Sequence, residues 1–205
     1  MIPANEALER LRSGNARFVS GRLDLDGALV QSRRSELTGG QAPFAIVLGC
    51  SDSRVPVEIL FDQALGDLFV IRVAGNIVAP SLIGSAEFAA TKLGTRLVVV
   101  LGHSQCGAIA ATLEDLREPS PDLSPNLGSI VGRVRPAVET VMNEAPGASD
   151  DDIIERAVRA NVMASVEQLR RESDILTRLA RDEGLAIVGA RYSLESGAVE
   201  FFPDA

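Results

Sequence analysis

Two stretches decide the fold: residues 43–54, which read PFAIVLGCSDSR, and residues 97–107, which read LVVVLGHSQCG. Each begins as an unbroken apolar run that reaches a glycine, a pattern typical of a parallel strand covered on both faces. Polar and thiol side chains follow at once. Ligands of open α/β sheets bind at the carboxyl ends of parallel strands. The two loops therefore predict one functional site at one edge of a sheet.

Working outward, the rest of the chain alternates between strand and helix patterns. This alternation predicts an α/β fold with a mostly parallel central sheet, four parallel strands plus a C-terminal antiparallel edge strand, flanked by helices. The further strands are expected at 67–73, which reads as buried, at 185–192 and at 197–201. Helices are expected at 3–20, in a short stretch ending at 37, at 57–60, at 81–93, from 107 onward, at 127–142 and at 151–170.

Length and charge narrow the class of protein. The 205 residues correspond to one domain over 1–205, with an N-terminal helical arm at about 1–38. There are 28 acidic and 20 basic residues, and the net charge of −8 argues against nucleic acid as a partner. The longest apolar runs are too short to cross a membrane, and no secretory signal pattern begins the chain, so we expect a cytoplasmic protein. Neither dinucleotide nor P-loop glycine motifs occur.

The rarest residues carry the chemistry. The chain has one histidine, His103, and two cysteines, Cys50 and Cys106. Two thiolates and an imidazole suit zinc, and three protein ligands leave a fourth position open to water or to Asp52. The alternatives are two unrelated buried thiols or a disulfide.

The clusters C-x-D-x-R and H-x-x-C-G together resemble the β-class carbonic anhydrases. The resemblance spans nearly the whole chain and includes GNARFVSGR, CSDSRVPVEILFDQALGDLFVIRVAGN, GSAEFA, VVVLGHSQCGAI and LAIVGARYSLESG. It implies one Zn²⁺ per chain on Cys50, His103 and Cys106. It further implies that Asp52 and Arg54 act together at the fourth position, and that Asp52 becomes the fourth ligand in a closed form.

The same resemblance implies a substrate pocket for carbon dioxide and bicarbonate. Its residues would be Gln41, Phe69, Ala74, Phe88 and Gly107. Members of the family are dimers or larger assemblies with pocket walls borrowed from the partner, so a homodimer or homotetramer is expected. The helices expected at 3–20 and 81–93 are the candidate contact surfaces.

The activity expected from the resemblance is the reversible hydration of carbon dioxide to bicarbonate and a proton. Two alternatives remain open at this point. One is hydrolysis of carbonyl sulfide or carbon disulfide on the same zinc site. The other is a zinc-binding module without catalytic activity, whose site Asp52 closes permanently.

Overall fold

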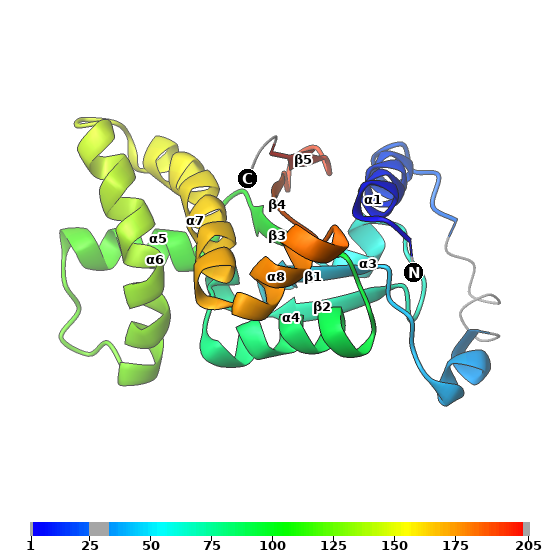
Figure 1. Cartoon of the computed structure of the whole chain (residues 1–205). Helices are drawn as coiled ribbons and strands as arrows, with labels where there is room; N and C mark the ends of the chain where they lie inside the picture. Colours follow the sequence, from blue (N-terminus) through cyan, green and yellow to red (C-terminus); the bar gives the residue numbers. More distant parts are fainter. Residues whose placement is uncertain (1, 25–32, 203–205) are drawn as a thin grey trace.

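A computed structural model describes residues 2–24 and 33–202. Its centre is a five-stranded sheet in the order β2-β1-β3-β4-β5 (Figure 1). Strands β1 to β4 run parallel to one another, and β5 runs antiparallel to β4. The predicted fold class is therefore confirmed. The strands are β1 (Ala45–Gly49), β2 (Leu68–Arg72), β3 (Leu97–His103), β4 (Ala186–Tyr192) and β5 (Val199–Phe201).

Burial separates the central strands from the edge. Every residue of β1 and β3 is buried, as their apolar runs predict. The predicted strand at 67–73 is confirmed as β2, but the prediction that it is buried is wrong, since Leu68, Phe69 and Val70 are only half-buried and Arg72 is exposed. The reason is strand order: β2 pairs with β1 alone and lies at the edge of the sheet.

Helices connect the strands. The prediction of helical residues up to 37 falls partly on 25–32, outside the described residues, while 33–36 are helical. One helix, α8, is not among those predicted. It begins after Ser173, whose hydroxyl accepts the Leu176 N–H, and stops at Gly184 in the left-handed conformation. The helices are α1 (Ala4–Val19), α3 (Val57–Leu60), α4 (Pro80–Lys92), α5 (Gly107–Arg117), α6 (Pro125–Glu144), α7 (Asp150–Glu172) and α8 (Asp174–Glu183), with 3₁₀ turns η1 (Leu37–Gly39) and η2 (Ala74–Asn76).

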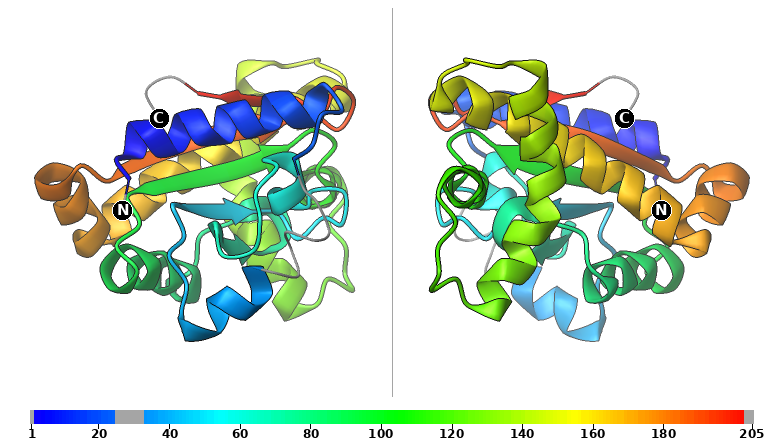
Figure 2. Two further views of the ribbon diagram at one scale, coloured as in Figure 1. Left: turned by 90° about the vertical axis from the view of Figure 1, so that its right-hand side faces the viewer. Right: turned by 90° about the vertical axis from the view of Figure 1, so that its left-hand side faces the viewer.

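Alternate residues of each strand point to opposite faces of the sheet, and different helices cover each face. On one side Ile46 and Leu48 pack against α4, α7 and α8. On the other side Ala45 and Val47 pack against α1 and α3. Figure 2 shows α1 and α4 on opposite sides of the sheet. In the described part of the chain, no helix combines the length and apolar character needed to cross a membrane.

A third apolar cluster surrounds the loops that follow the carboxyl ends of β1 and β3. It is formed mainly by α5, α6 and α7, which Figure 1 shows gathered on its left side. Cys50 and Cys106 belong to this cluster. The two loops identified in the sequence are thus enclosed by packed helices.

Candidate metal centre

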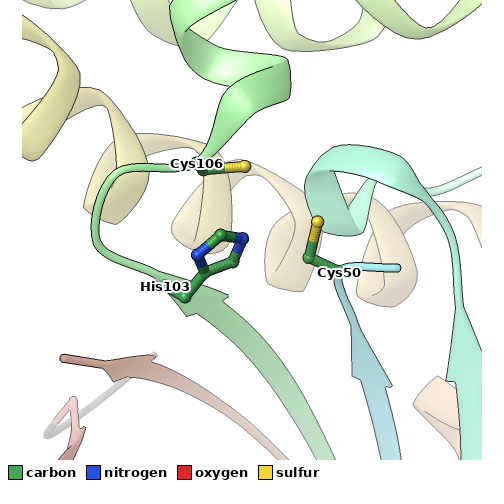
Figure 3. Close-up of side chains that lie close together, drawn as sticks. All are labelled: Cys50, His103 and Cys106. Carbon is green, nitrogen blue, oxygen red and sulfur yellow. The ribbon is translucent and has the colours of Figure 1, made fainter. Parts of the chain in front are cut away.

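Neighbouring strands bring the three rare residues together. Cys50 directly follows β1, His103 is the last residue of β3, and Cys106 is the N-cap of α5. Because β1 and β3 are parallel, with Gly49 opposite Leu101, their carboxyl ends lie side by side. The two sulfur atoms and a ring nitrogen lie within 4.8 Å of one another, and all three residues are buried. Figure 3 shows the side chains converging on a common point.

The imidazole of His103 is oriented by its own loop. Nδ1 lies 2.9 Å from the Ser104 carbonyl oxygen, so this nitrogen donates its hydrogen and leaves the lone pair on Nε2. Nε2 is buried, and among residues 2–24 and 33–202 it has no hydrogen-bond partner. A buried polar atom left unpaired is destabilising, and a metal ion at the cluster would supply the missing partner. The residues present therefore fit a metal ion.

The two cysteines are free thiols, so the disulfide alternative is wrong. Their convergence with His103 also rules out two unrelated buried thiols. Hydrogen bonding from the Cys106 thiol lowers the pKa of Cys50 to about 4, and the backbone N–H groups of Asp52 and Gly75 add to this effect against the opposing effect of burial. The pKa of Cys106 is raised because it keeps the shared proton and is buried. Mutual hydrogen bonding thus moves the pKa values of the two thiols in opposite directions.

Asp52 and Arg54 lie beside the cluster as a paired unit. Asp52 Oδ1 accepts from the Arg54 backbone N–H at 2.9 Å and from Nε at 3.0 Å, and Oδ2 accepts from Nη2 at 2.8 Å. This guanidinium holds the pKa of the Asp52 carboxyl well below its usual range. Arg54 Nη2 also donates to the Gln105 carbonyl at 3.3 Å, so it joins the two loops. Arg72 Nη2 donates to the Asp52 carbonyl at 2.8 Å.

Two of the predicted pocket residues lie next to the three candidate ligands. Ala74 precedes Gly75, whose N–H donates to Cys50 Sγ at 3.3 Å. Gly107 directly follows Cys106, and a Cβ added there would meet no atom within 4 Å. The space beside Gly107 is therefore open in this chain.

The other three predicted pocket residues are not brought to the cluster by a single chain. Gln41 precedes β1 and is exposed, whereas Cys50 follows the opposite end of that strand. Phe69 pairs with Ile46 in the sheet, roughly 13 Å of strand away from Cys50. Phe88 lies on α4, with its ring centroid 6.3 Å from that of Phe69. These residues stay predictions that require a second chain.

Two residues behind Cys50 are not among those predicted from the sequence. Asn161 and Ser165 of α7 are buried and hydrogen-bond to η2, the turn that contacts the Cys50 sulfur. The available signal was a polar residue on an apolar helix face, because Asn161 lies between Val158 and Val162 in the α7 pattern.

Comparisons with known proteins agree with this geometry. A family model described as carbonic anhydrase matches residues 45–199. A carbonic anhydrase of Mycolicibacterium smegmatis is 42% identical over 194 residues, covering 95% of this chain and 91% of that protein. Carbonic anhydrase 2 of Mycobacterium tuberculosis is 38% identical over 191 residues, covering 93% and 89%. The solved Coccomyxa β-carbonic anhydrase, in complex with acetazolamide, aligns with a TM-score of 0.76 at 29% identity, covering 85% of this chain and 78% of that chain.

Proposed function

The chain belongs to the β-carbonic anhydrase family, and from this premise we propose that it catalyses the zinc-dependent, reversible hydration of carbon dioxide to bicarbonate and a proton. The observation that carries the proposal is the buried set of two sulfurs and one unpartnered imidazole nitrogen within 4.8 Å. Thiolate and imidazole are ligands that zinc prefers, and a set of three leaves one position for substrate chemistry.

Cys50, His103 and Cys106 would hold the ion. Zinc, when bound, supplies a Lewis acid that lowers the pKa of water from 15.7 to about 7. His103 is oriented by the chain itself. The hydrogen bond from its Nδ1–H to the Ser104 carbonyl fixes the ring so that Nε2 faces the cluster. The two thiols give up their remaining proton on binding the metal, which makes metal affinity depend on pH.

Asp52 would orient the attacking water by accepting its hydrogen. Its carboxylate is suited to this because Arg54 holds the pKa of the carboxyl below its usual range and fixes the group by two side-chain hydrogen bonds. An acceptor at this position aims the water lone pair at the carbon atom of the substrate and excludes other orientations. Arg54 would also keep the carboxylate from swinging onto the metal position.

The small side chains Ala74 and Gly107 leave room beside the ligands for a linear, neutral substrate. We propose that the remaining pocket wall, with Gln41, Phe69 and Phe88, faces the site of a partner chain in a homo-oligomer. Support comes from Phe88, a large apolar side chain that is 50% exposed in the single chain. Thiolate ligands must stay reduced, which suits the cytoplasm.

The test is the rate of carbon dioxide hydration by the purified chain, by a chelator-stripped sample and by the stripped sample after zinc is returned. We expect activity to disappear with the metal and to return at one zinc per chain. Carbonyl sulfide and carbon disulfide, offered to the same three samples, test the alternative substrates. A zinc-loaded chain that hydrolyses a sulfur substrate and does not hydrate carbon dioxide would overturn the proposal.

A further inference from the structure

The sulfur of Cys50 accepts a hydrogen bond from a turn that is distant in sequence. Gly75 in η2 donates its backbone N–H to Cys50 Sγ at 3.3 Å, and both residues are buried. A hydrogen bond of this kind withdraws electron density from a thiolate ligand and fixes its direction. The position of the η2 backbone therefore matters for any metal held by Cys50.

This turn has an unusual backbone. Gly75 has φ 71° and Asn76 has φ 43°, so two consecutive residues adopt the left-handed conformation. Asparagine adopts this conformation more readily than other residues with a side chain, but the Asn76 side chain does not secure it here, because its buried Nδ2 has no hydrogen-bond partner among the described residues. A Cβ added to Gly75 would lie 3.0 Å from Ala108 Cβ and 3.3 Å from Val134 Cγ2. The turn is therefore tightly enclosed, and its two carbonyls are held by hydrogen bonds from outside the turn.

Helix α7 supplies the support. Asn161 Nδ2 donates to the Gly75 carbonyl at 2.8 Å, and Ser165 Oγ donates to the Asn76 carbonyl at 3.2 Å. The two donors are one helical turn apart, and both are at least nine-tenths buried. They bind the carbonyls of the two left-handed residues, one donor to each. Helix α7 packs against β3, and this packing fixes the positions of the two donor side chains.

We propose that Asn161 and Ser165 are positioning residues for the metal centre: by holding the carbonyls of η2 they aim the Gly75 N–H at the Cys50 sulfur. Neither side chain touches the ligand set; both act through the turn. The inference rests on the proposed zinc site. According to this inference, the electron density on the Cys50 sulfur depends on Asn161 of α7, which lies 86 residues after Gly75 in the sequence.

The test uses cobalt(II) in place of zinc, because a sulfur-to-cobalt charge-transfer band reports the electron density of the thiolate directly. In Asn161→Ala the turn is no longer held, so the Gly75 N–H no longer points at the Cys50 sulfur. The sulfur then keeps more electron density, and the band should move to longer wavelength. Zinc affinity, measured by chelator competition, should fall roughly tenfold, the size typical when a partner of a metal ligand is removed. Ser165→Ala should shift both readouts in the same direction by less.

Asn15→Ala is the matched control. Asn15 is another buried asparagine, and it lies on α1 at the other face of the sheet. Its side chain donates to the Leu60 and Gly197 carbonyls. Its loss should lower the melting temperature without moving the cobalt band. If Asn161→Ala does not fold, Ser165→Ala decides, since it is close to volume-conserving. A wild-type band and zinc affinity in the folded variants would overturn the inference. A wild-type chain that binds neither metal would instead defeat the proposed function.

Discussion

The Asp52 carboxylate lies beside the unpartnered nitrogen of His103 while Arg54 binds it from the other side. Asp52 Oδ2 is 3.9 Å from His103 Nε2 and 2.8 Å from Arg54 Nη2. The carboxylate is thus within a short side-chain movement of the metal position. Water reaches this ion pair from the Arg54 side, since the Arg54 side chain is 50% exposed and that of Asp52 is 17% exposed, so the pair is separated at modest cost. Asp52 therefore has two alternative positions, one paired with Arg54 and one at the metal site, and the two are in equilibrium.

Arg54→Ala should shift this balance toward the metal position. Without the guanidinium the carboxylate stays ionised at neutral pH, because the pKa of an ordinary aspartate is about 3.9. It then competes with hydroxide, whose concentration rises with pH. We therefore expect hydration activity to fall more than tenfold at pH 7 and to recover in part above pH 9. A pH–rate profile of the zinc-loaded variant measures this.

Arg54→Lys separates charge from geometry, since lysine keeps the charge but lacks the two-pronged donor. It should restore less than half of the lost rate. Arg54 has no role at the fourth position if Arg54→Ala retains the wild-type profile. Protonation of Asp52 does not explain an acid limb near pH 6, because Arg54 holds the pKa of this carboxyl below its usual range in the wild type.

Asp52→Asn should keep zinc and lose about 100-fold in hydration rate. The amide has nearly the same shape, but it can donate a hydrogen to the water and so turn the lone pair away from the substrate. Zinc content and turnover of the same sample are the measurements. Ser53→Ala, an exposed neighbour, is the control and should match the wild type. A zinc-replete Asp52→Asn protein within twofold of wild-type turnover would refute the role given to Asp52.

The metal-free protein should show one reactive thiol at pH 6. The pKa of Cys50 is lowered to about 4, so its thiolate is present above that pH, whereas Cys106 keeps its proton. Iodoacetamide should therefore modify Cys50 at least tenfold faster than Cys106, as mapped by mass spectrometry. In denaturant at pH 6 the two rates should become equal and slow, because an ordinary thiol has a pKa near 8.5. Equal rates in the folded metal-free protein would contradict the asymmetry.

Phe88→Asp should weaken self-association and hydration activity together. Phe88 is half-exposed beside Phe69 on the face where we place the partner chain. Sedimentation should show a larger share of single chains for this variant. Leu127→Asp is the control, since Leu127 on α6 is similarly exposed at 47% but outside that face. A fully active single chain at assay concentration would contradict a site shared between subunits.

The sequence predicts the three candidate ligands because their placement follows from local rules. Apolar runs ending in glycine identify β1 and β3, and parallel strands bring Cys50 and His103 to one edge. The exposure of β2 could not be predicted in this way, since it depends on strand order. Helix α8 was missed because a single residue, Ser173, separates it from α7, and its ten residues read as a continuation of a charged segment.

The hydrogen bonds from Asn161 and Ser165 to η2, behind Cys50, join segments that are far apart in the sequence, so no local sequence pattern predicts them. Asn161 bonds to Gly75, 86 residues away, and only the packed structure shows this pairing. The positions of Gln41 and Phe88 illustrate a different limit. Their place at a pocket depends on a second chain, so neither the sequence pattern nor the fold of one chain determines it.

Zinc K-edge X-ray absorption of the active protein at pH 8.5 tests the assignment of Cys50, His103 and Cys106 as the ligands of a catalytic zinc. We expect two sulfur neighbours at about 2.3 Å, one imidazole nitrogen at about 2.0–2.1 Å and one further light atom. The sulfur shell should halve or disappear in Cys106→Ser. A shell of oxygen and nitrogen alone around zinc in the fully active wild type would contradict it.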